Sequence, residues 1–182
     1  NDVFAVGAGG SIVHYDGSTW TPMSSGTTTY LHGVWGNSSS DVFAVGYGGT
    51  ILHYNGSAWS TMTSGSATYL HSVWGASHSD VFAVGADGSV LHYDGVDGNS
   101  DGSPWDPMTS GFTNSLYGIW GSASTDVLAV GYLGTILRYD GSNWSGVGSI
   151  TRNHLAGVWG SASDNVLAVG AGGTIIRHDG SS

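Results

Sequence analysis

The strongest constraint on this chain is a repeat of 39 residues that runs through its whole length. The motif Ala-Val-Gly recurs with its glycine at positions 7, 46, 85, 131 and 170. Three of the four spacings are 39 residues, and the remaining one contains a seven-residue insertion. Self-similarity at a fixed period of about 20 to 50 residues is typical of solenoids, propellers and other repeat architectures.

Each full repeat contains four short segments that favour β-strands. In one repeat these segments are residues 31–36, 41–46, 50–54 and 59–63. In the second segment, residues 42–45 form a continuous apolar run, as expected of a strand buried on both faces, and the third segment is β-branched and aromatic. Four strands in about 40 residues predict one blade of a β-propeller, whose apolar faces are buried only when neighbouring blades stack on it. Between the third and fourth strands, Asn55-Gly56 predicts a type I′ hairpin turn with positive φ at both residues.

We therefore expect an all-β fold, a β-propeller of four-stranded antiparallel blades that forms a single domain. The repeats are predicted at about residues 1–30, 31–69, 70–115, 116–154 and 155–182. Solenoids and stacked hairpins are alternatives, although their usual periods are shorter.

The chain begins at the second strand of a repeat and ends after the third, which leaves two ways to close a ring. A five-bladed ring would lack the inner strand of its first blade and the outer strand of its last. A four-bladed ring would use residues 155–160 to complete the first sheet. We expect five blades, with the ring either incomplete or completed by another chain. Another chain could complete it because the unpaired N–H and C=O groups of an edge strand can pair with a strand of a second molecule.

Composition excludes several classes of partner. The formal charge is -10, from 13 acidic and 3 basic residues, and cysteine is absent. Such a surface repels nucleic acid and anionic membranes, and no apolar run approaches the roughly 20 residues of a membrane helix, so we expect neither nucleic-acid binding nor membrane insertion. Without cysteine there is no disulfide and no thiolate metal site. A low fraction of charged residues, 9%, with abundant Gly, Ser, Thr, Trp and Tyr favours an extracellular or cell-surface location.

The segment Tyr15-Asp16-Gly17-Ser18-Thr19-Trp20 resembles the Asp-box, or bacterial neuraminidase repeat, of six- and seven-bladed propellers. The repeats are also similar to the propellers of photosystem II assembly factors, whose blades run through a Val-Gly turn to Asp-Gly and Trp. The chain departs from the Asp-box at His14, where that motif has Ser or Thr, and its Asp-to-Trp gap is one residue shorter. The resemblance implies a propeller with the first strand of each repeat innermost, and it implies no neuraminidase activity.

We expect no enzyme activity from the charged residues. Neuraminidases require a glutamate and three converging arginines, yet this chain has no Glu, and Arg138 and Arg177 occupy nearly equivalent positions in successive repeats. The aspartates recur at strand starts and turns, where Asp usually accepts hydrogen bonds from local backbone N–H groups. Paired carboxylates across a cleft, as in glycoside hydrolysis, are therefore not expected.

The insertion contains D-x-N-x-D-G, the pattern of an oxygen-ligand calcium loop. The candidate Ca²⁺ ligands are Asp97, Asn99, Asp101, Ser103 through its carbonyl, and Asp106. The twelfth position is Met108 instead of the bidentate Glu of an EF-hand, so the motif is incomplete. The alternative is an acidic, solvated extension of a turn.

Histidines recur at equivalent positions 14, 53 and 92. Because they lie one blade apart, we expect them to be too far apart to share a metal ion and to lie between blades. His32 and His71 fall on the predicted inner strand, where they could approach each other, whereas Tyr117 and Ala156 interrupt a complete ring of histidines. The tryptophans recur once per repeat at two positions and are expected to pack between sheets.

Candidate ligand-binding residues lie where the repeats differ on the face formed by the second-to-third and fourth-to-first strand connections. They are Tyr30, Tyr47, Tyr69, Asp87, Tyr132 and His154. Tyrosine rings beside Asp and His suit a sugar or a protein surface, and the alternative is that these are ordinary loop residues. We expect a non-catalytic module that recognises a glycan or a protein. The alternative function is a structural repeat unit that self-associates into oligomers or filaments through its open strand edges.

Overall fold

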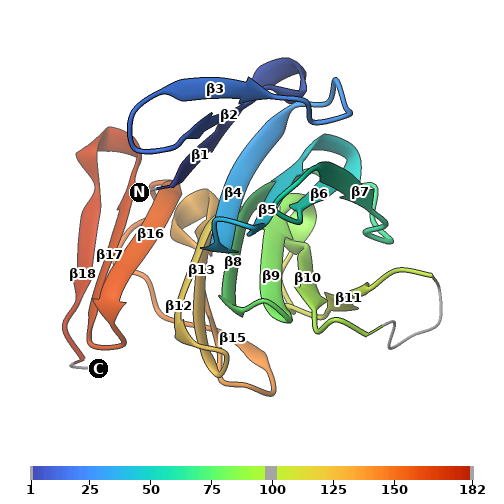
Figure 1. Ribbon diagram of the computed structural model, residues 1–182. Coiled ribbons are helices and arrows are strands. Elements are labelled where there is room, and N and C mark those ends of the chain that lie inside the picture. The colour runs from blue at the N-terminus through green and yellow to red at the C-terminus, as the bar shows by residue number, and fades with distance from the viewer. Residues whose placement is uncertain (1, 97–101, 181–182) are drawn as a thin grey trace.

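The computed structural model describes residues 2–96 and 102–180 and is all-β within them (Figure 1). Five antiparallel sheets, here called blades 1 to 5, follow one another along the chain and fan out around a common axis. Among the described residues no helix has the length and hydrophobicity needed to span a membrane. The predicted fold class, an all-β propeller of antiparallel blades, is confirmed, and the five sheets agree with the expected five blades.

The strands occur in the predicted order within each blade. Blade 1 contains β1 (Val3–Val6), β2 (Ile12–Tyr15) and β3 (Trp20–Met23). Blade 2 contains β4 (Leu31–Ser38), β5 (Asp41–Gly46), β6 (Ile51–Tyr54) and β7 (Trp59–Met62). Blade 3 contains β8 (Leu70–Ser77), β9 (Asp80–Gly85), β10 (Val90–Tyr93) and β11 (Trp105–Met108). Blade 4 contains β12 (Leu116–Ala123), β13 (Asp126–Gly131), β14 (Ile136–Tyr139) and β15 (Trp144–Gly146). Blade 5 contains β16 (Leu155–Ala162), β17 (Asn165–Gly170) and β18 (Ile175–His178). A short 3₁₀ turn joins the second and third strand of every blade: η1 (Ala8–Gly10), η2 (Tyr47–Gly49), η3 (Ala86–Gly88), η4 (Tyr132–Gly134) and η5 (Ala171–Gly173).

The inner strands β4, β8, β12 and β16 lie side by side around the axis, as the sequence resemblance implied. Small residues permit this approach. A Cβ atom built on Gly33 would lie 3.0 Å from Cα of Ser72 on the next inner strand. A Cβ on Gly118 would lie equally close, 3.0 Å, to Cα of Gly157. Larger side chains at these positions would force the inner strands apart.

The core lies between the blades. Phe43, Val45 and Ile51 on one face of blade 2 are buried in one cluster with Ala83 and Trp105 on the facing side of blade 3. Equivalent clusters join blade 1 to 2, blade 3 to 4 and blade 4 to 5. Each blade thus has a leading face, which packs on the next blade, and a trailing face, which receives the previous one. The core is therefore the one expected from the sequence, in which neighbouring blades bury one another's apolar faces.

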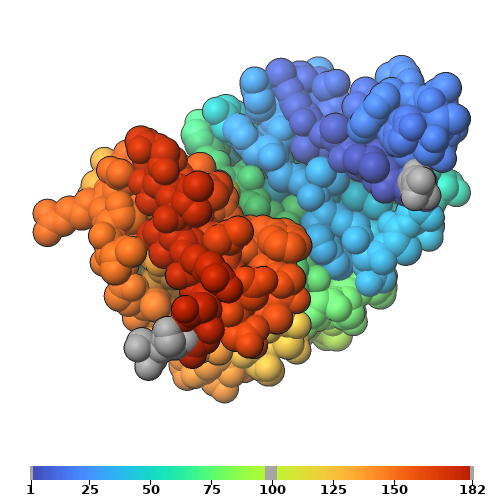
Figure 2. Space-filling model, turned by 90° about the vertical axis from the view of Figure 1, so that its left-hand side faces the viewer, coloured from blue at the N-terminus to red at the C-terminus, as the bar shows by residue number. Residues whose placement is uncertain are grey.

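In the described part of the chain, blades 1 and 5 have three strands each, and each leaves one sheet face uncovered. The leading face of blade 5 exposes Trp159 and Ile175, whose exposed fractions are 62% and 71%. The trailing face of blade 1 exposes Val3 and Trp20. In Figure 2 a hollow separates the red and orange surface of blade 5 from the blue surface of blade 1. The alternative four-bladed ring is wrong, because β16 pairs with β17 in a sheet of its own.

The predicted type I′ turn at Asn55-Gly56 is also wrong. Four residues separate the paired Tyr54 and Trp59, and among the described non-glycine residues only Asp87 and Leu133 have positive φ. Instead, Oδ1 of Asn55 accepts hydrogen bonds from the backbone N–H groups of the residues two and three positions later, at 3.0 and 3.1 Å. This side-chain capping stabilises a longer turn that needs positive φ only at glycine.

Candidate functional site

The η turns and the connections that enter the inner strands share one face of the molecule, and three predicted tyrosines meet there. The Tyr47 ring stacks on the Tyr69 ring with centroids 4.3 Å apart and planes inclined by 16°. It also stacks on Tyr30 at 5.6 Å. The backbone fixes this arrangement, because the Tyr47 N–H donates to the Tyr30 carbonyl oxygen at 3.0 Å. The three tyrosine residues are 40 to 49% exposed, so they offer an accessible aromatic surface.

Histidines on the inner strands extend this surface toward the axis. His32 lies 4.8 Å from Tyr47 and 5.7 Å from His71, measured between ring centroids. His71 in turn lies 5.3 Å from Tyr117 on β12. The predicted approach of His32 and His71 is confirmed, whereas Tyr117, expected only to interrupt the histidines, continues the row of rings. Burial lowers the pKa of His71, and the neighbouring His32 lowers it further, so the neutral ring is favoured.

We call this set the aromatic surface. Its members come from blades 2, 3 and 4 and are Tyr30, Tyr47, Tyr69, His32, His71 and Tyr117. The sequence signal for its inner half is the residue that follows the first leucine of each inner strand. That position holds an aromatic ring in blades 2 to 4 and Ala156 in blade 5.

Two other predicted residues form a separate pair on the same face. The Tyr132 ring stacks on His154 with centroids 4.3 Å apart and planes inclined by 21°. The backbone N–H of Leu133 donates to His154 Nδ1 at 3.1 Å. This pair occupies the positions of Tyr47 and Tyr69 two blades later in the repeat. Asp87 lies in η3, in the blade between the two stacked pairs.

Backbone strain marks the same face. Asp87 has φ 56° and Leu133 has φ 52°, at a position where the other three η turns have glycine. A side chain in this left-handed region costs roughly 1 kcal/mol or more, less for Asp than for Leu. The two turns thus project a side chain from a position where the other repeats project none, and Leu133 is exposed.

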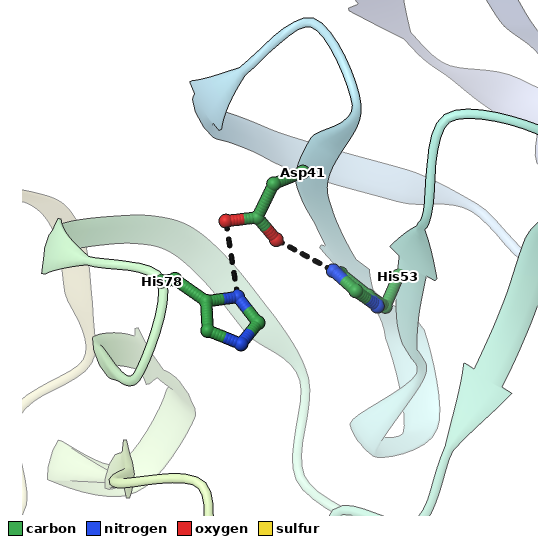
Figure 3. A group of neighbouring side chains, drawn as sticks. All are labelled: Asp41, His53 and His78. Carbon is green, nitrogen blue, oxygen red and sulfur yellow. Dashed lines mark hydrogen bonds and ion pairs between the residues drawn. The ribbon is translucent and has the colours of Figure 1, made fainter.

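A cluster of one aspartate and two histidines, drawn in Figure 3, lies at the start of β5, on the face opposite the η turns. His53 Nε2 donates to Asp41 Oδ1 at 2.7 Å, and His78 Nδ1 donates to Oδ2 of the same carboxylate at 3.2 Å. Asp41 begins β5 and His53 lies on β6, whereas His78 belongs to the turn between β8 and β9 of the next blade. The three ligand atoms lie within 4.8 Å of one another.

The first two members of this cluster recur along the chain. His14 pairs with Asp2 and His92 pairs with Asp80, both at 2.7 Å. In blade 4 the arginine Arg138 takes the place of the histidine and pairs with its aspartate at 2.8 Å. The repeated histidines therefore pair with an aspartate of their own sheet. His78 has no such recurrence, and sequence reasoning missed it.

Three of the predicted calcium ligands, Asp97, Asn99 and Asp101, lie outside the described residues. Ser103 is buried, and its hydroxyl donates to the Thr63 carbonyl at 3.0 Å. Asp106 lies in β11 opposite His92. The calcium site stays a prediction.

Comparison with known proteins identifies the fold. No protein-family model and no curated protein matches the chain. Among solved structures, YCF48 from Cyanidioschyzon merolae is similar with a TM-score of 0.75 and 15% identity, over 97% of this chain and 66% of that chain. A structure of YCF48 bound to D1 peptide has a TM-score of 0.70 and 15% identity, over 97% and 59% of the two chains. The domain thus spans about two thirds or less of these proteins. The resemblance to photosystem II assembly-factor propellers is confirmed for the fold, and the Asp-box resemblance stays a prediction.

Proposed function

We propose that this domain is a non-catalytic protein-recognition module that binds a peptide segment on its aromatic surface. The observation that carries the proposal is the stack of Tyr47 on Tyr69, which leaves both rings exposed beside Tyr30 and His32. Tyrosine supplies a large contact area at low cost in conformational entropy and is enriched in binding hot spots. In support, a YCF48 protein of the same fold has been solved with a bound D1 peptide.

The charge of the chain indicates which peptides it prefers. A formal charge of -10 attracts cationic segments and repels acidic ones. Lys or Arg side chains can also lie over tyrosine faces in cation–π contacts. We therefore propose a ligand segment that combines basic and apolar residues. We also propose an extracellular or cell-surface location, which the low fraction of charged residues and the abundance of Gly, Ser, Thr, Trp and Tyr favour.

Selection from a displayed peptide library tests this proposal. We expect enriched peptides to be basic, and we expect Tyr47→Ala and Tyr69→Ala to weaken binding of the best peptide by about 10-fold or more, the effect of removing a hot-spot side chain. Trp20→Ala is the control, because Trp20 is also an exposed ring but lies on the outer strand β3, away from the aromatic surface. Unchanged affinity in both tyrosine variants would remove the aromatic surface as the binding site.

The same rings suit the apolar faces of sugars, so a glycan is the other ligand class to distinguish. A glycan array probed with the wild type and with Tyr47→Ala separates the two. Binding of a glycan that Tyr47→Ala abolishes, with no peptide enriched, would assign the aromatic surface to carbohydrate instead of protein.

The uncovered sheet faces favour a second candidate function, self-association. Blade 5 exposes a leading face, with Trp159 and Ile175, and blade 1 exposes a trailing face, with Val3 and Trp20. These are the two halves of the contact that joins successive blades inside the chain. A second copy of the chain can therefore continue the stack head to tail. We propose this face-to-face contact in place of the edge-to-edge pairing expected from the sequence.

Light scattering across a concentration series tests self-association. We expect the average mass to rise with concentration and Ile175→Asp to suppress the rise. Ile150→Asp is the control, since Ile150 is 89% exposed but lies in a loop away from the sheet faces. A monomer at every concentration would overturn this second candidate.

A further inference from the structure

We propose that Asp41, His53 and His78 form a binding site for a divalent transition-metal ion of the Zn²⁺ class. Figure 3 shows both imidazole rings turned toward the single carboxylate between them. The potential ligand atoms, one carboxylate oxygen and two imidazole nitrogens, lie within 4.8 Å of one another. Two histidines and one carboxylate are a common protein ligand set for Zn²⁺, with water completing the tetrahedron.

Two of the three ligands are held in place by the fold. The Asp41 side chain is only 12% exposed and lies at the start of a buried strand. The His53 ring packs on the Phe43 ring with centroids 4.5 Å apart. His78, in contrast, lies on a turn with 63% of its side chain exposed, so its ring can adjust. A site with two fixed ligands and one adjustable ligand can close around an ion at little cost.

The ligand atoms are already close to the spacing that an ion needs. Bonds of about 2.0 to 2.2 Å to a tetrahedral ion place neighbouring ligand atoms roughly 3.3 Å apart. His53 Nε2 lies 2.7 Å from Oδ1 of Asp41 and His78 Nδ1 lies 3.2 Å from Oδ2, and one ligand atom from each residue lies within 4.8 Å of the other two. In the metal-free state each of these nitrogens carries the hydrogen that it donates to Asp41. On binding, a neutral ring transfers that hydrogen to its other nitrogen and presents a lone pair to the ion.

The repeats supply an internal comparison. The pairs Asp2–His14 and Asp80–His92 have the same 2.7 Å geometry as Asp41–His53. At the turn position of His78, the neighbouring blades have Ser39 and Ser124. The aspartate–histidine pair is therefore a repeated feature of the sheet, and the turn histidine alone distinguishes the three-residue cluster. An ion bound there would connect blade 2 to blade 3.

Isothermal titration of the metal-free protein with Zn²⁺ tests the site, with excess Ca²⁺ present to occupy oxygen-ligand sites. We expect one Zn²⁺ per chain. His78→Ser should weaken binding by about 100-fold or more, because loss of a ligand exceeds the roughly 10- to 100-fold effect of losing a residue that only orients one. This variant should fold, because serine is the residue found at the same turn position in the neighbouring blades. His53→Arg should abolish binding while keeping an ion pair of the Arg138–Asp126 kind.

The matched control and a converse variant concern the equivalent pair in blade 3, Asp80 and His92. His92→Arg alters the equivalent pair, which has no turn histidine, and should leave Zn²⁺ affinity unchanged. Ser124→His places a histidine beside Asp80 and His92 and should raise the stoichiometry from one to two. The proposal is overturned if the wild type takes up no Zn²⁺, or if His78→Ser binds as tightly as the wild type. A stoichiometry that stays at one in Ser124→His would contradict the role assigned to the turn histidine.

Discussion

The indole ring of Trp35 on β4 covers Gly75 on β8, the inner strand of the next blade. A Cβ atom built on Gly75 would lie 2.6 Å from Cη2 of Trp35. The same relationship recurs between Trp74 and Gly121 and between Trp120 and Gly160, at 2.5 and 2.7 Å. Trp159 has the equivalent position in blade 5 and is largely exposed, because none of the described blades packs against it. The absence of a side chain at this glycine therefore makes room for the tryptophan ring of the previous blade.

Gly75→Ala should destabilise the domain by about 1 to 3 kcal/mol, because the added methyl group overpacks the contact with Trp35. Urea denaturation measures the change. Gly148→Ala is the control, since a Cβ built on Gly148 meets nothing within 4 Å and its φ is not in the left-handed region. Equal stability of the two variants would show that the Trp–Gly contact adapts freely.

Leu133→Gly should stabilise the domain or leave it unchanged, even though it removes an apolar side chain. Glycine relieves the roughly 1 kcal/mol cost of a leucine at φ 52°. Asp87→Gly should gain less, because aspartate tolerates this conformation better. Thermal unfolding of the two variants measures both effects. A clear loss of stability in Leu133→Gly would mean that its exposed side chain makes contacts worth more than the strain.

Asp140→Asn should make the stability of the domain decrease less steeply as the pH is lowered. Backbone N–H groups of Asn143 and Ser142 donate to Asp140 Oδ1, each at 2.8 Å, and lower the pKa of the carboxyl from 3.8. A lowered pKa in the folded state stabilises the protein above about pH 4 and is lost as the pH falls toward the folded value. Asn55, which caps the equivalent turn in blade 2, shows that the amide fits. Urea midpoints between about pH 5 and pH 2 should therefore fall less steeply in the variant than in the wild type.

His71→Tyr should remove part of the pH dependence near neutrality. The pKa of His71 is lowered from 6.5 by burial and by His32. The unfolded chain therefore takes up the proton first, and stability is lost as the pH falls through about 6.5. Tyr117, the equivalent residue of the next inner strand, shows that tyrosine fits there. The difference in unfolding free energy between about pH 7.5 and pH 5.5 should be smaller in the variant, and an equal or larger difference would contradict the assignment.

The fold could be predicted from the sequence because the same pattern of strand-forming apolar residues recurs in every repeat. Strand order and the stacking of blades follow from apolar positions that recur in each copy, such as Leu31 and Leu70, both fully buried. The turn at Asn55-Gly56 could not, because an Asx side chain can cap a four-residue turn as readily as it can occupy a tight one. Which of the two turns forms depends on which residues pair across the hairpin, and the pairing of Tyr54 with Trp59 leaves four residues in the turn.

The candidate sites were predictable only in part. The tyrosines could be found because they break the repeat on one face, and the structure brings Tyr30, Tyr47 and Tyr69 together. His78 could not, because its contact with Asp41 spans 37 residues and arises only from the packing of two blades. No spacing rule relates a single turn residue to a carboxylate in the neighbouring sheet.

Hydrogen–deuterium exchange with and without the most strongly enriched peptide locates the bound peptide on the domain without any substitution. If the peptide binds the aromatic surface, exchange slows in η2 (Tyr47–Gly49), in the connection that ends at Tyr69 and at the start of β8. Protection confined to the opposite face, around Asp41 and His78, or to the uncovered sheet of blade 5, would contradict binding at the aromatic surface.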